Sequence, residues 1–114
     1  MIKDFSLDLI PAEQFVGSAK HFVKRYYGQN MSPELKHGDL LLCRRISSSS
    51  IALWGHIYMF ATEQGILIGR VNPGKDDRTV TMTPENPDYD SYDLPLSSIY
   101  EAALVIGRIT EYAY

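Results

Sequence analysis

The side chains able to perform chemistry are few in this chain, and their spacing fits no metal-binding or nucleophilic motif. Three histidines and one cysteine are scattered along the 114 residues: His21, His37, His56 and Cys43. No pair has a ligand spacing such as Cys-x-x-Cys or His-x-x-x-His, so we predict no structural metal site. The cysteine stands in an apolar run without a neighbour that lowers its pKa, which favours a small buried hydrophobe over a nucleophile.

Each of two clusters of charged residues could bind a ligand or could be an ordinary solvated surface. One is a set of acids in a loop, where the central glycine and terminal glutamate of a calcium loop are missing: Asp88, Asp90 and Asp93. We interpret them as a solvated acidic loop. The other cluster precedes two tyrosines, a pattern that can bind single-stranded nucleic acid: Lys20, Lys24 and Arg25. Because the net charge is −3, we interpret it as a strand with a charged face.

Apolar runs separated by turn residues predict the scaffold that positions these groups. Five runs are typical of strands: 39–46, 57–61, 66–71, 79–83 and 102–109. Gln64-Gly65 joins the second and third as a hairpin. Residues 84–90 contain two prolines and three acids, which predicts a loop, and residues 94–99 suggest one helical turn. The pattern therefore predicts a mostly β fold.

Length and composition exclude several protein classes. A chain of 114 residues with 45% hydrophobic and 11% aromatic residues fits one folded domain and is too apolar for a disordered segment. No apolar run approaches the roughly 20 residues that a membrane span needs, and the N-terminus lacks the layout of a signal peptide. The acidic balance excludes a global basic field for nucleic acid. A single cysteine is compatible with the cytosol, so we expect a cytoplasmic domain.

One segment is more specific than all others. Residues 27–42 read YGQNMSPELKHGDLLL, with a glycine, then Met-Ser-Pro-x-Leu, then Gly-Asp and an apolar strand. This order resembles the signature of the LexA-like self-cleaving repressor and UmuD family. Residues 54–71 are similar to the family's hairpin, and residues 104–109 to its last strand. The resemblance covers nearly the whole chain and is closest to the C-terminal peptidase-like domains of phage-type helix-turn-helix repressors.

The resemblance implies a LexA/signal-peptidase-like compact β fold of coiled sheets and hairpins. It divides the chain into an N-terminal arm with a degenerate cleavage-site region, residues 1–25, and a peptidase-fold core, residues 26–114. The vestigial cleavage site falls at Val16 and Gly17, where a β-branched residue precedes the bond. Four residues shape the motif: Met31, Pro33, Gly38 and Asp39. We expect Met31 in the core, Pro33 and Gly38 in turns, and Asp39 hydrogen-bonded to the turn before the strand.

The two positions that carry the family's chemistry differ here. In the family a serine attacks the peptide and a neutral lysine takes its proton, which requires a desolvated amine. The resemblance places the serine position at Asn30 and the lysine position at Gly69. An amide is a poor nucleophile, and glycine has no side chain. We therefore predict a pseudo-peptidase without catalytic residues, metal or cofactor.

Three functions remain open at this point. The first is the dimerisation and regulatory module of a phage-type repressor, with DNA bound only through a separate helix-turn-helix domain. Its homodimer interface is expected on an apolar edge strand: Leu104, Val105, Ile106, Arg108 and Ile109. The second is a stand-alone UmuD-like protein that binds a polymerase, a repair factor or another regulatory protein. The third is an active Ser-Lys protease with its dyad placed elsewhere.

Overall fold

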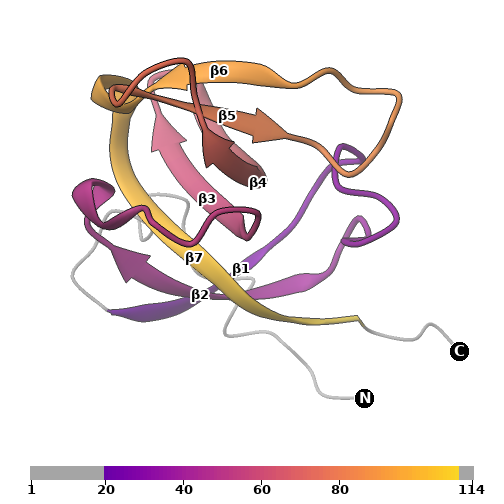
Figure 1. Cartoon of the computed structure of the whole chain (residues 1–114). Coiled ribbons are helices and arrows are strands. Elements are labelled where there is room, and N and C mark those ends of the chain that lie inside the picture. Colours follow the sequence, from indigo (N-terminus) through magenta and orange to yellow (C-terminus); the bar gives the residue numbers. More distant parts are fainter. Residues whose placement is uncertain (1–19, 111–114) are drawn as a thin grey trace, which may run out of the picture.

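The computed structural model describes residues 20–110, and this part of the chain is almost entirely β (Figure 1). The elements follow in the order β1 (His21–Arg25), β2 (Leu40–Ile46), the one-turn 3-10 helix η2 (Ser48–Ser50), β3 (Ile57–Thr62), β4 (Gly65–Pro73), β5 (Thr79–Thr83), β6 (Tyr92–Pro95), the one-turn 3-10 helix η3 (Leu96–Ser98) and β7 (Ile99–Ile109). The prediction of a mostly β fold is confirmed. Between residues 20 and 110, no helix is long and apolar enough to cross a membrane.

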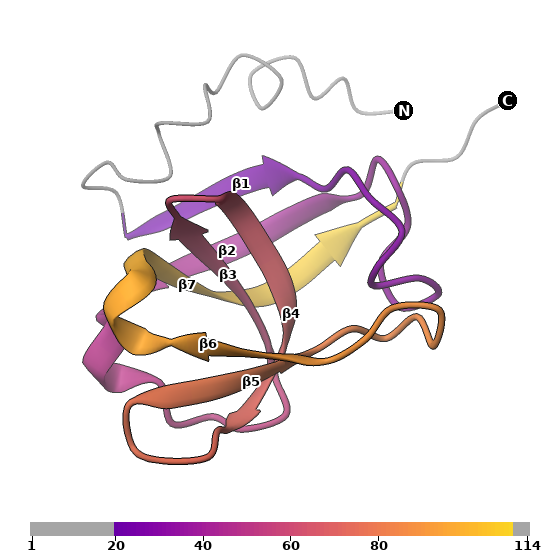
Figure 2. The same ribbon diagram turned by 90° about the horizontal axis from the view of Figure 1, so that it is seen from above.

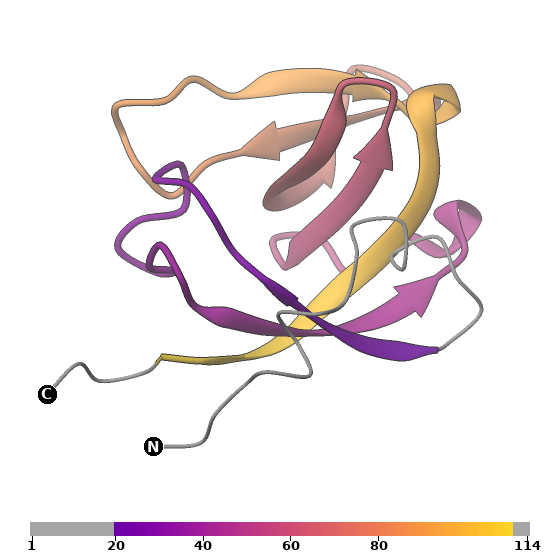
Figure 3. The same cartoon turned by 180° about the vertical axis from the view of Figure 1, so that it is seen from behind.

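All seven strands form one antiparallel sheet in the order β1-β2-β7-β3-β4-β5-β6. The sheet is strongly coiled, so that β1 and β2 lie on one side of the molecule and β5 and β6 on the other (Figure 3). The long curved β7, yellow in the figure, runs between these two sides. This coiling brings loops from opposite ends of the sheet together, and it creates the site described below.

The core consists of two clusters, one on each face of the central strands. Successive side chains of a strand point to opposite faces, so a strand buried on both faces is apolar throughout. In β3, Met59 and Ala61 join a first cluster with the segment after β1, whereas Tyr58 and Phe60 join a second cluster with β5 and β6. The continuous apolar run that predicted this strand therefore reflects burial on both sides.

The predicted strands agree with the observed ones to within a few residues. The hairpin at Gln64-Gly65 joins β3 and β4, and η3 lies within the predicted helical turn. The basic segment forms β1, which pairs with β2, so the interpretation as a strand is confirmed. That strand lies within residues 1–25, which the sequence assigns to the arm. The short strand β6 was not predicted, because four residues ending in Pro95 give no readable alternation.

The expectation that the last strand lies at an edge is wrong for its first half. β7 pairs with β3 through Leu104 and with β2 from Ala102 to Ile109, so it is a central strand. Leu104, expected at a dimer interface, is 6% exposed and packs in the second cluster. From Val105 to Ile109 the strand pairs with β2 alone among the described residues. This C-terminal half therefore keeps one unpaired edge.

Candidate functional site

The segment between β1 and β2 is closed by hydrogen bonds around a buried aspartate. Tyr26 donates its backbone N–H to the carbonyl of Asp39 at 2.8 Å, and Gly38 donates back to the carbonyl of Tyr26 at 2.7 Å. The carboxylate of Asp39, 2% exposed, accepts from the backbone N–H of Lys36 and from the hydroxyl of Thr110, each at 2.8 Å. Gly38 has a φ of +94°, which a residue with a Cβ rarely adopts. These contacts fix the turn that starts β2.

The middle of this segment is anchored in the core. Met31 is fully buried and belongs to the first cluster together with Leu35. Leu35 donates its N–H to the carbonyl of Met31 at 2.8 Å, which closes a turn that contains the cis Ser32-Pro33 peptide bond. The turn holds the residue before Met31, Asn30, at the mouth of a hollow beside β4.

Asn30 is held by hydrogen bonds on both ends of its amide group. Its Oδ1 accepts from the Tyr26 hydroxyl at 2.6 Å, and its Nδ2 donates to the carbonyl of Ile68 at 2.9 Å. The Tyr26 hydroxyl also accepts the backbone N–H of Met31 at 3.0 Å. Burial raises the pKa of Tyr26, so its hydroxyl remains a donor through neutral pH. Asn30 therefore ties the segment after β1 to strand β4.

Gly69 follows Ile68 directly, so the two positions that the resemblance pairs lie together in the fold. A Cβ on Gly69 would approach the Met82 Cε at 3.4 Å and the Thr83 carbonyl oxygen at 3.5 Å, which is ordinary contact. The position that a Gly69 side chain would take therefore faces Met82 of β5. Between residues 20 and 110, no lysine amine donates to a serine hydroxyl among the described side chains.

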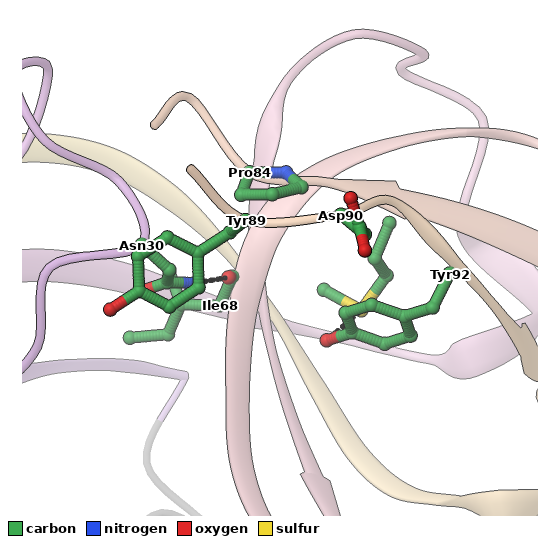
Figure 4. A pocket seen from close by; sticks show the side chains of 7 residues that line it. Asn30, Ile68, Pro84, Tyr89, Asp90 and Tyr92 are labelled. Atoms are coloured by element: carbon green, nitrogen blue, oxygen red, sulfur yellow. Dashed lines mark hydrogen bonds between the residues drawn. The ribbon is translucent and has the colours of Figure 1, made fainter. Parts of the chain in front are cut away.

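Two hollows that share lining residues lie beside Asn30 and Ile68. The larger has a volume of about 360 Å³ and extends from the segment after β1 along β4. The smaller, about 60 Å³, lies between Asn30, Ile68 and the loop that joins β5 to β6 (Figure 4). The rings of Tyr89 and Tyr92 border both, and the carboxylate of Asp90 borders the smaller one.

The loop between β5 and β6 reaches this site because one asparagine fastens it there. Asn86 donates its backbone N–H to the carbonyl of Asn30 at 3.0 Å and its side-chain amide to the carbonyl of Gln29 at 2.9 Å. Figure 2 shows this loop beside the segment that connects β1 to β2. Nearby, Arg70 donates to Glu85 and, at 2.7 Å, to the carbonyl of Gly55. The site is therefore assembled from segments far apart in the sequence.

A model of the peptidase S24-like family matches residues 6–110 of the chain. The chain belongs to this family. The LexA-like resemblance drawn from residues 27–42 is thereby confirmed, and the S24-like match extends across the described strands. A comparison with curated proteins finds no match.

The other candidate residues of this S24-like chain lie apart from the Asn30–Gly69 pair or serve the local structure. His37 accepts the backbone N–H of Gly28 at 3.0 Å through Nδ1 and packs edge-on against Tyr27. Cys43 is fully buried, and burial raises the pKa of its thiol to about 12. No group of three metal-ligating side chains occurs in the described part of the chain. Val16 and Gly17 lie outside the described residues.

Several site residues escaped sequence reasoning. Tyr26 was considered only beside the basic cluster, yet its hydroxyl holds Asn30. Tyr89 lies in the loop whose position depends on Asn86, and Tyr92 begins β6, whereas Asp90 was considered only as a member of the acidic cluster. The one hint in the sequence that these residues form a site is the tyrosines of the acidic segment, because large aromatic side chains are usually partly buried and are unusual in a fully solvated loop.

Proposed function

We propose that this chain is a catalytically inactive LexA-like domain that assembles a phage-type transcriptional repressor as a cytoplasmic homodimer. In this proposal, DNA is contacted by a separate helix-turn-helix domain, and dimerisation places two such domains on two half-sites. A regulatory protein is a further partner of the assembled repressor.

The hydrogen bonds of Asn30 support the part of the proposal that the domain is catalytically inactive. Ser-Lys catalysis needs a hydroxyl that attacks and a neutral amine that accepts its proton. Here the Asn30 amide accepts from the Tyr26 hydroxyl and donates to the Ile68 carbonyl, so both of its polar atoms hold the local structure together. Gly69 offers no base, and a guanidinium such as that of neighbouring Arg70 stays protonated. These observations support a fold kept for binding and assembly.

The C-terminal half of β7 supports the part of the proposal that the domain forms a homodimer. Its unpaired edge offers backbone donors and acceptors to a second copy, which an antiparallel two-fold pairing would satisfy. Three apolar side chains on β2 and β7 are exposed by 40%, 43% and 57%: Leu42, Ile106 and Ile109. Leu42 pairs with Gly107, and a Cβ on that glycine would meet Leu42 at 3.8 Å.

Sedimentation equilibrium tests the dimer with two matched substitutions on the same strand. Ile109→Asp places a charge within the unpaired half, and Tyr100→Asp places one at a 60% exposed position outside it. Burial of one isoleucine contributes about 1.5–3 kcal/mol, and the residue occurs twice in a dimer. We expect Ile109→Asp to weaken dimerisation by at least roughly 100-fold and Tyr100→Asp to leave it unchanged. A wild-type chain that stays monomeric at high concentration, or equal losses in both variants, contradicts the proposal.

A further inference from the structure

The smaller hollow beside Asn30 has a chemistry that neither the motif nor the dimer explains. Its volume of about 60 Å³ exceeds the roughly 10–15 Å³ that a cavity needs to hold one water molecule. The hollow is therefore large enough for a small polar group. The walls are aromatic and apolar except for the Asn30 amide and one carboxylate.

The residues that line the smaller hollow favour the binding of a positively charged group. The residues Tyr89 and Tyr92 are 47% and 41% exposed and border the hollow together with Asp90 (Figure 4). Asp90 makes no hydrogen bond or ion pair with any residue between 20 and 110 through its side chain. An aromatic face attracts a cation through its quadrupole, and a nearby carboxylate adds to that attraction. An anion would meet repulsion from both.

The hollow is formed before any ligand arrives. The Tyr92 hydroxyl donates to the Met82 sulfur at 3.6 Å, which orients the ring. Asn86 accepts the N–H of Tyr89 at 3.1 Å through its carbonyl and the N–H of Asp88 at 2.9 Å through Oδ1. The loop is thus bonded within itself as well as to Asn30, so little ordering accompanies binding.

The surroundings favour a peptide as the carrier of the cation. The smaller hollow shares Asn30, Ile68, Tyr89 and Tyr92 with the larger one of about 360 Å³, which follows β4 from Ile66 to Ile68. Along this stretch β4 pairs with β3 on one side, and β5 joins on the other side only from Arg70 onward. On this edge the Ile68 carbonyl already accepts from Asn30, so an extended strand would join the remaining backbone groups of β4 before Arg70, as in peptide recognition by strand addition.

We propose that the smaller hollow binds the ammonium group of a lysine side chain carried by an extended peptide. The peptide lies in the larger hollow along β4 and places its lysine between Tyr89, Tyr92 and Asp90. Arg70, two residues after Ile68 in β4, is committed to Glu85 and to the carbonyl of Gly55. The site depends only on these residues and not on whether the domain dimerises.

Nuclear magnetic resonance titration of the full chain, labelled with nitrogen-15, tests the proposal. The probe is the capped tripeptide acetyl-Val-Lys-Val-amide, compared with the same peptide carrying neutral ε-acetyl-lysine and with n-butylammonium. We expect saturable shifts at residues 84–92 and at the Asn30 side-chain amide. The lysine peptide should bind roughly 3- to 30-fold more tightly than the acetylated one, and butylammonium should bind more weakly than the lysine peptide.

Matched variants separate the aromatic and charged contributions. Tyr89→Leu should weaken the lysine peptide by roughly 3- to 30-fold, and Tyr89→Phe should retain its binding because the ring remains. Asp90→Asn should weaken it by roughly 2- to 5-fold, whereas Asp88→Asn, in the same loop but outside the hollow, should not. Equal binding of the acetylated peptide, equal effects of the two aspartate variants, or an absence of shifts at residues 84–92 would each overturn the proposal. Butylammonium binding as tight as the peptide would overturn the role of β4.

Discussion

Replacement of Asn30 by alanine is expected to destabilise the fold far more than its partial exposure suggests. The change removes the acceptor of the Tyr26 hydroxyl and the donor to the Ile68 carbonyl, at 2.6 and 2.9 Å. Tyr26 is 2% exposed, so its hydroxyl would lose its acceptor in a largely buried position. A hydrogen bond contributes about 0.5–1.5 kcal/mol net, and a buried polar group left without a partner costs about 1–3 kcal/mol. We expect a loss of about 2–3 kcal/mol in the free energy of unfolding.

Urea denaturation of four proteins measures this effect and its origin: the wild type, Asn30→Ala, Tyr26→Phe and the double variant. The two side chains share one hydrogen bond, so the cycle should give a coupling energy of about 1 kcal/mol. Gln29→Ala is the matched control, because Gln29 is exposed and only its backbone carbonyl accepts a bond from Asn86. A loss below about 0.5 kcal/mol for Asn30→Ala, or strict additivity in the cycle, would refute the structural role assigned to the amide.

Two glycines and the cysteine give further predictions. Gly69→Ala should change stability by less than about 1 kcal/mol, because the new Cβ meets Met82 at ordinary contact distance. Gly74→Ala should cost about 1–3 kcal/mol in the same denaturation assay, because its Cβ would lie 2.5 Å from the Thr79 carbonyl oxygen. Iodoacetamide at pH 8 should label Cys43 in urea but not in the native chain, as followed by mass spectrometry, because its pKa is raised to about 12 by burial. Since the unfolded thiol loses its proton first, stability measured against pH should fall from about pH 8.5 upward, and a rise there would contradict this sign.

The strands were predictable from sequence because each is an apolar or alternating run bounded by turn residues. Their neighbours in the sheet were not. The run from Ala102 to Ile109 reads equally well as an edge strand and as a central one, and only tertiary pairing places β7 between β2 and β3. The strand β6 was missed because Leu94 is its single buried residue, which leaves no periodic signal.

The site was predictable only where a motif existed. The order of residues around Asn30 and the hairpin that contains Gly69 indicated that the two positions meet, and the hydrogen bond from Asn30 to Ile68 agrees with this. The hydroxyl of Tyr26 lies only four positions before Asn30, but its bond to the amide depends on how the segment after β1 folds. The rings of Tyr89 and Tyr92 are more than fifty positions from Asn30, and no local rule relates residues so far apart, so their convergence required the folded chain.

Prolonged incubation of the purified chain at alkaline pH, followed by the intact mass, tests the proposed inactivity most directly. Alkaline conditions favour the neutral amine that a Ser-Lys dyad needs, so any residual self-cleavage is fastest there. With Asn30 and Gly69 at the positions that the resemblance assigns to the dyad, we predict a single uncut mass throughout. A specific break between Val16 and Gly17, with a rate independent of protein concentration, would contradict the proposal and restore the chain to the active peptidases.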